Sequence, residues 1–149
     1  LQKSGKAIRY FWVNEVNSVI TSPCPEKPWT HLKKGEMVEI EGLAWSGHGT
    51  IKGVDISFDG GDNWVEAKLK GLVLPKSWTR FSYIIKWDGK PMILASRSYD
   101  DFGNIQPTID EETSAVGVES VYHRNAIVTW EITSKGECNN VQIRKHKKA

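Results

Sequence analysis

The chain has 149 residues, of which 39% are hydrophobic and 26% are charged, and its formal net charge is +2. This length and composition are typical of a single globular domain, residues 1–149. The small net charge excludes an extended acidic or basic polymer binder, and no run approaches the roughly 18 apolar residues of a membrane-spanning helix.

The charge is unevenly placed. Residues 144–148 hold four positive charges, which leaves 16 basic against 18 acidic residues in the rest. We therefore expect a lead-in over 1–15, a folded body over 16–143 and a basic tail over 144–149. The tail is either a solvated terminus or a docking arm for an acidic partner, and the body lacks the basic face of a nucleic-acid binder. The start at Leu1, without a Met or a signal peptide, predicts a fragment or a processed form.

Short runs of alternating apolar and polar residues are the main structural signal. Val54, Ile56 and Phe58, for example, alternate with Asp55 and Ser57. Such alternation places one face of a strand on a core and the other in water. It predicts an all-β fold, an immunoglobulin-like (E-set type) antiparallel sandwich of seven or eight strands. The expected strands lie at about 17–21, 37–45, 51–58, 63–69, 80–87, 91–98, 126–133 and 138–144.

The segment 107–121 has no such alternation, and we expect a long excursion or a short helical turn there. Two cysteines, Cys24 and Cys138, are too few for a disulfide scaffold; they form either one disulfide or two free thiols. Seven tryptophans are many for this length. They are expected to fill the core or cover its ends, the alternative being an exposed platform for a sugar or a partner protein.

The stretch 57–64 reads Ser-Phe-Asp-Gly-Gly-Asp-Asn-Trp and fits the Asp-box pattern S-x-D-x-G-x-x-W. The residues of the pattern are Ser57, Asp59, Gly61 and Trp64. It predicts a hairpin turn in which the carboxylate accepts N–H bonds and the tryptophan covers the turn. A single copy argues against a repeated propeller. The three aspartates nearby lack the spacing of a calcium loop.

No other motif predicts chemistry in this chain. The glycines at 47 and 49 are followed by a strand and not by the helix of a phosphate-binding loop, and Ser46 lacks the glycines of a nucleophile elbow. None of the histidines, at 31, 48, 123 and 146, has a metal-ligand spacing. These patterns predict no catalytic residue, no metal site and no bound cofactor in this chain.

Several segments together resemble the C-terminal dimerisation domain of the sulfite oxidase family of molybdenum enzymes, and most of all its sulfur (sulfane) dehydrogenase, SoxC-type branch. The resemblance covers about residues 16–143. The segments that carry it are 42–49, which holds Trp45, 51–57 with the Asp-box, 96–108, which holds Asp100, Gln106 and Pro107, and 122–127.

The resemblance implies an immunoglobulin-like sandwich that pairs two subunits and braces a catalytic domain absent from this chain. That domain would bind molybdenum-molybdopterin, so this chain alone is not expected to be active. The family also implies a homodimer, a cytochrome c electron-acceptor subunit as a further partner, sulfur oxidation and a periplasmic location. It implies neither nucleic-acid nor membrane binding.

The family can also lend an arginine from this domain to an anionic substrate pocket. An arginine fork suits a sulfur oxyanion. The matching stretch here is His123-Arg124-Asn125-Ala126. One alignment offers Arg124, beside His123, and the other places Thr129 at the arginine position. The structural alternative is that Arg124 forms a salt bridge.

Two other functions compete with this hypothesis. One is a stand-alone immunoglobulin-like module that binds a carbohydrate or a protein, which would expose tryptophans in a row. The other is a hydrolase on a sandwich fold, which would need a cluster of Ser, His or carboxylate groups that no spacing marks. The fold alone does not separate these functions.

Overall fold

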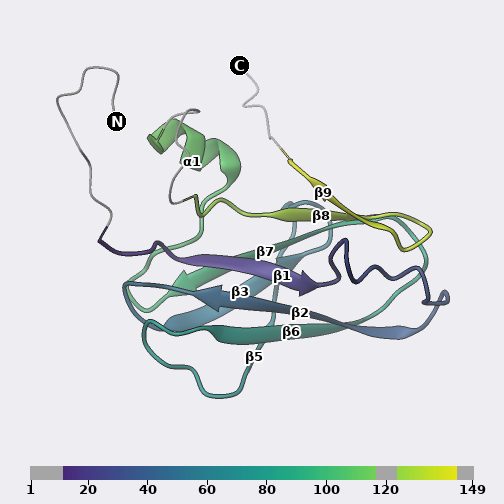
Figure 1. Cartoon of the computed structure of the whole chain (residues 1–149), viewed down its shortest axis with the longest axis horizontal. Coiled ribbons are helices and arrows are strands. Elements are labelled where there is room, and N and C mark those ends of the chain that lie inside the picture. Colours follow the sequence, from purple (N-terminus) through teal and green to yellow (C-terminus); the bar gives the residue numbers. More distant parts are fainter. Residues whose placement is uncertain (1–11, 117–123, 144–149) are drawn as a thin grey trace.

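The computed structural model describes residues 12–116 and 124–143. Nine strands and one helix lie within these ranges (Figure 1). Their bounds are β1 (Asn17–Ser22), β2 (Met37–Trp45), β3 (Ile51–Ser57), β4 (Val65–Glu66), β5 (Lys68–Lys70), β6 (Thr79–Lys86), β7 (Met92–Asp100), α1 (Ile109–Val116), β8 (Thr129–Ile132) and β9 (Cys138–Val141). In the described part of the chain, α1 is too short and polar to cross a membrane.

The strands form two antiparallel sheets, with the orders β1-β2-β6-β5 and β4-β3-β7-β8-β9. The core fills the space between them. Ile40 and Phe81 from the first sheet meet Ile56, Leu94 and Ile132 from the second, and none of these five side chains is exposed. Burying each one contributes about 1.5–3 kcal/mol. The predicted all-β, immunoglobulin-like sandwich is confirmed.

The predicted strand over 63–69 is in fact two short strands in different sheets. Val65 and Glu66 pair with β3, whereas Lys68 to Lys70 pair with β6. Ala67 lies between them, is buried, and donates its N–H to Val54 O at 2.8 Å. A single alternating run thus crosses from one sheet to the other, which an alternation pattern does not reveal.

The strand β8 begins later than the pattern predicts, whereas β9 begins at the predicted residue, 138. β8 starts at Thr129 and not at 126, because the residues before it bond to other elements. Ile127 donates its N–H to Pro107 O, and the N–H groups of Asn125 and Ala126 donate to the Glu112 carboxylate. Those backbone groups are therefore not available for the sheet.

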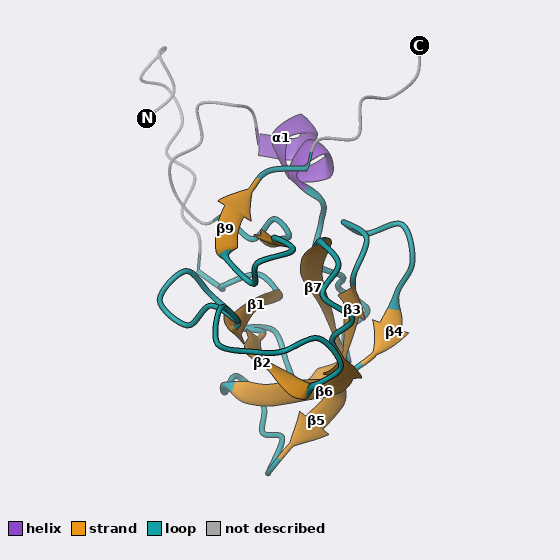
Figure 2. Ribbon diagram, turned by 90° about the vertical axis from the view of Figure 1, so that its right-hand side faces the viewer, coloured by secondary structure: helices purple, strands orange, loops and turns teal. Residues whose placement is uncertain are grey.

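The segment after Pro107 contains the helix α1, so the helical alternative is correct for this part, and residues 117–121 lie outside the described ranges. The helix begins with a capping box. Thr108 Oγ1 accepts from the N–H of Glu111, and Glu111 Oε2 accepts from the N–H of Thr108 at 2.8 Å. The bonds that Thr108 donates to the Glu111 carboxylate, first from its N–H and then from its hydroxyl, lower the pKa of Glu111. Figure 2 shows α1 on the side of the molecule opposite β5.

The cysteines and tryptophans resolve two open alternatives. Cys24 and Cys138 are both free thiols. Trp29 and Trp87 are buried with ring centroids 6.0 Å apart, and Trp130 donates its Nε1–H to Ile20 O, as expected for core residues. Two further tryptophans, at 12 and 78, are exposed.

Candidate functional site

The Asp-box forms the predicted turn between β3 and β4. Ser57 Oγ donates to Asp59 Oδ1 at 2.7 Å and accepts the N–H of Gly61 at 2.8 Å. Asp59 Oδ1 also accepts the N–H groups of Asp62 and Asn63. The pKa of Asp59 lies well below its ordinary value, chiefly because Asn63 donates from its backbone and side chain and Ser57 from its hydroxyl. The carboxylate therefore holds the turn together.

Trp64 connects this turn to the sheet through Arg97. The guanidinium of Arg97 lies 4.4 Å from the centre of the Trp64 ring, and its Nη2 lies 2.7 Å from Asp55 Oδ2. Stacking and pairing of this kind hold a long side chain in one orientation. Arg97 thus stabilises the outer face of the sheet.

Asp100 organises the loop that follows β7. The carboxylate is buried and accepts Ser46 Oγ–H at 2.7 Å, the N–H of Phe102 at 3.0 Å and the N–H of Asn104 at 2.9 Å. Burial alone would raise the pKa of Asp100, but the hydrogen bonds from Asn104, Ser46 and Phe102 outweigh it and hold the pKa below its ordinary value. Asp100 is committed to folding the loop.

Gln106 is buried where β1 passes β7, and Pro107 follows it toward α1. Gln106 Oε1 accepts Ser18 Oγ–H at 2.6 Å, and Gln106 Nε2–H donates to Asn17 Oδ1 at 2.8 Å. Ser18 Oγ is also 2.9 Å from Ser96 Oγ. A buried amide with its partners satisfied in this way fixes how two elements meet. Here it joins β1 of the four-stranded sheet to the end of β7 in the five-stranded sheet.

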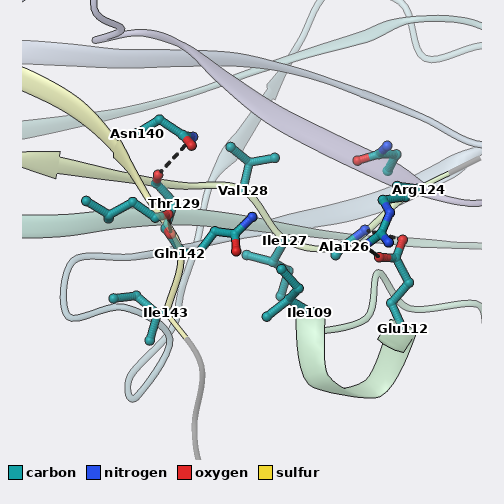
Figure 3. Close-up of a pocket in the computed structure, with 12 residues that line it drawn as sticks. Ile109, Glu112, Arg124, Ala126, Ile127, Val128, Thr129, Asn140, Gln142 and Ile143 are labelled. Atoms are coloured by element: carbon teal, nitrogen blue, oxygen red, sulfur yellow. Dashed lines mark hydrogen bonds and ion pairs between the residues drawn. The ribbon is translucent and has the colours of Figure 1, made fainter. Parts of the chain in front are cut away.

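Arg124 lies at the edge of a pocket between α1 and β9. The pocket has a volume of about 210 Å³. Figure 3 shows Arg124 next to Glu112, with Thr129, Asn140 and Gln142 on the β8–β9 side. The pocket combines these polar groups with an apolar wall of isoleucine and valine side chains, at 109, 127, 128, 141 and 143.

The Glu112 carboxylate connects α1 to the segment that leads into β8. Its Oε1 accepts the N–H of Asn125 at 2.7 Å and of Ala126 at 3.1 Å, while its Oε2 lies 3.4 Å from Arg124 Nη1. The Glu112 side chain is only 4% exposed, whereas that of Arg124 is 38% exposed. The salt bridge expected as the structural alternative for Arg124 is therefore present.

The other predicted members of this site are placed differently. Thr129 is buried, and its hydroxyl donates to Val141 O, so it belongs to the β8–β9 pairing. His123 lies outside the described residues. Among the described residues that line the pocket, Glu112 is the single carboxylate, and no histidine or cysteine is present. These groups can hold an anion or a partner chain but lack a nucleophile with a base.

Sequence reasoning missed Glu112, which is central to this region. The signal available was Thr108-Ile109-Asp110-Glu111, a capping box that starts a helix after Pro107 and so places Glu112 in its first turn. Which way that residue faces depends on the return of the chain at Asn125, which is not a local property.

The chain matches a known protein family over most of its length. Residues 9–130 match the family model of the Mo-co oxidoreductase dimerisation domain. The chain belongs to this family. Relatives of the dimerisation domain include mitochondrial sulfite oxidase of Rattus norvegicus, 34% identical over 99 residues, covering 62% of this chain and 17% of that protein. Sulfite oxidase of Gallus gallus is 31% identical over 98 residues, covering 62% and 20%.

A solved structure is similar over nearly all of the chain. The crystal structure of the sulfane dehydrogenase SoxCD from Paracoccus pantotrophus matches with a TM-score of 0.89 and 46% identity, covering 95% of this chain and 36% of that chain. The resemblance to the sulfite oxidase family and its SoxC-type branch is confirmed. The dimerisation domain spans about a fifth or less of the sulfite oxidases it matches and about a third of the solved chain.

These matches favour the dimerisation-domain hypothesis over a free binding module. Among the described residues, no group of three or more His, Cys, Asp or Glu could hold a metal ion. The site around Arg124 and Glu112 therefore belongs to a dimerisation domain.

Proposed function

We propose that this dimerisation domain pairs two subunits of a molybdenum-dependent sulfite oxidase-like or sulfane dehydrogenase-like enzyme and braces the catalytic domain of the same polypeptide. The observation that carries the proposal is the match to SoxCD, which covers 95% of this chain but only 36% of the solved chain. A domain that is one part of a larger enzyme, and whose family is named for dimerisation, is most simply an assembly element.

The buried Cys138 does not suit a molybdenum ligand, which supports the placement of molybdenum-molybdopterin in the other domain. Cys138 is buried, and burial first, followed by the nearby Cys24 and Glu26, raises its pKa to about 11. A metal-ligating cysteine needs a thiolate, which a raised pKa disfavours. Neither cysteine lines the pocket beside Arg124. No step of the enzyme's chemistry is assigned to a cofactor on this chain.

Arg124 serves in this proposal as a positioning residue. Its guanidinium pairs with Glu112, and Glu112 holds the backbone at 125 and 126. The guanidinium is partly exposed at the pocket and so could also face an anionic substrate in the neighbouring domain. We assign the pairing role on geometry, and the substrate contribution of Arg124 and His123 stays a prediction.

The wider assignments follow from the same proposal. We infer a homodimer, a cytochrome c subunit as electron acceptor, sulfur oxidation as the reaction and the periplasm as the location. The family match and the likeness to the sulfane dehydrogenase SoxCD support subunit pairing and sulfur chemistry. The cytochrome c subunit and the periplasm extend the family resemblance of the sequence.

The proposal is tested by removing residues 16–143 from the longer enzyme that contains them. We expect the truncated enzyme to lose subunit pairing, measured by light scattering after gel filtration, while a catalytic domain that still binds metal keeps its molybdenum content. Pairing that persists without these residues would refute the assembly role.

A further inference from the structure

Large apolar side chains stay exposed at one end of the sandwich, where the chain enters β1. Leu72 is 78% exposed, Phe102 is 70% exposed and Trp78 is 60% exposed. Leu74, Trp12 and Val13 are exposed at the same end. We call these six residues the loop-end patch. Apolar side chains gathered in this way on ordered loops typically mark an interaction site.

The loops that carry the patch are bonded into one surface, at the left of Figure 1. Lys76 in the β5–β6 loop donates its N–H to Gly49 O at 2.8 Å, which ties that loop to the β2–β3 loop. Gly47 in the β2–β3 loop donates to Asn14 O at 2.9 Å, which ties it to the lead-in. The ring of Phe102 packs so closely on Gly49 that a Cβ there would lie 2.6 Å from it.

The β5–β6 loop is held in a defined conformation. Trp78 packs on Trp45 with ring centroids 4.4 Å apart. Lys76 has a φ of 54°, which is uncommon for a residue other than glycine. A loop ordered in a costly conformation while it presents leucine and tryptophan to the outside is preorganised for contact.

The place where the chain enters the domain indicates what covers the patch. The lead-in reaches β1 at this end, because Asn17 pairs with Trp45 at the end of β2. The described chain therefore begins, at Trp12, at the same end of the sandwich as the patch. In the similar SoxCD chain, 64% of the residues lie outside the part matched here, since the match covers 36%. A tethered domain at this end has a high effective concentration for the patch.

The outer face of the four-stranded sheet is a weaker candidate for that contact. It carries Lys70, which forms ion pairs with both Glu39 and Glu41. Met37 and Ile84 are exposed on the same face, where Ile84 is paired with Glu39 in the β2–β6 ladder and Met37 lies two residues before Glu39. Desolvating paired charges has a cost that burying the loop-end patch avoids.

We propose that the loop-end patch docks the domain that precedes residue 12 in the longer polypeptide, an inference that rests on the proposed bracing function. The contact holds the two domains at a fixed angle and shields Trp78, Leu72 and Phe102 from water. Subunit pairing then uses a different surface of the dimerisation domain.

The test compares hydrogen–deuterium exchange in the 149-residue chain and in the longer polypeptide that contains it. We expect the amides of 71–78 and 101–105 to exchange roughly tenfold more slowly in the longer protein. The loop over 88–90 is at the opposite end of β6 and serves as the internal control. Leu72→Ser, which removes a side chain that barely packs, should restore fast exchange in 71–78, and Ile84→Ser should not.

Each other outcome overturns the docking assignment. Equal exchange in the two proteins would show that the patch is uncovered, while the pairing function would stand. If exchange in these loops of the isolated 149-residue chain became slower as its concentration rose, the patch would be the pairing surface. A reading frame with no preceding domain would remove both the docking contact and the bracing function but leave pairing to be measured by itself.

Discussion

The Glu112 carboxylate and the Arg124 guanidinium meet at 3.4 Å, although the glutamate is nearly buried and the arginine is partly exposed. The stronger bonds of Glu112 go to the backbone N–H groups of Asn125 and Ala126. Glu112 therefore fixes the path of the chain into β8, and Arg124 adds charge compensation at the pocket edge.

Replacing Glu112 should destabilise the domain. Glu112→Ala removes the acceptor of two part-buried backbone N–H groups and the carboxylate that pairs with Arg124, so we expect the free energy of unfolding to fall by about 2–4 kcal/mol. Glu112→Gln keeps one acceptor oxygen and should cost about half as much. Urea denaturation measures both. Asp110→Asn in the first turn of the same helix is the control, and an equal loss in that variant would contradict this role of Glu112.

Asp100 should make the stability fall in acid. Its folded pKa lies below the ordinary 3.8, so the carboxylate favours the folded state above that pH, and this contribution is lost as the pH falls through the folded pKa. Thermal unfolding of the wild type and of Asp100→Asn from pH 7 to pH 2 measures the effect. The difference between them should be large at pH 7 and shrink in acid. A constant difference over this range would be inconsistent with the Asp100 bonds described above.

The two thiols should differ in reactivity. Burial raises the pKa of Cys138 to about 11, so at pH 8 almost none of it is thiolate, whereas Cys24 is only half-buried. Iodoacetamide labelling of the folded protein, followed by mass spectrometry, should modify Cys24 first. Both should react equally in denaturant. Faster labelling of Cys138 in the folded chain would be incompatible with this burial.

Gly42 should not tolerate a side chain. It lies in β2 between Ile20 of β1 and Phe81 of β6, and a Cβ there would lie 2.2 Å from Phe81 Cζ and 2.5 Å from Val19 O. We expect Gly42→Ala to lower the free energy of unfolding by about 1–3 kcal/mol. In a double-mutant cycle, Phe81→Leu should relieve part of that loss. Fully additive effects would show that the ring of Phe81 does not lie over Gly42.

Alternation in the sequence predicts the strands well where one face of a strand is buried and the other is not. Val54 and Ile56 in β3 and Phe81 in β6 point into the core as expected. The Asp-box is also predictable, because the bonds of Asp59 stay within five residues of one turn.

The remaining features depend on contacts between distant parts of the chain. Ala67 looks like the middle of one strand, but the bond to Val54 O places it between two sheets. Glu112 looks like an exposed helix residue until the chain returns at Asn125. Neither outcome follows from local pattern, because each partner lies more than twelve residues away.

The central claim is that this domain associates with itself, and sedimentation equilibrium of the 149-residue chain tests it most directly. We predict a dimer in the range of tens of micromolar, with an association that is saturable and stops at two copies. A mass that stays that of a monomer, 16.8 kDa, throughout this range would contradict autonomous pairing.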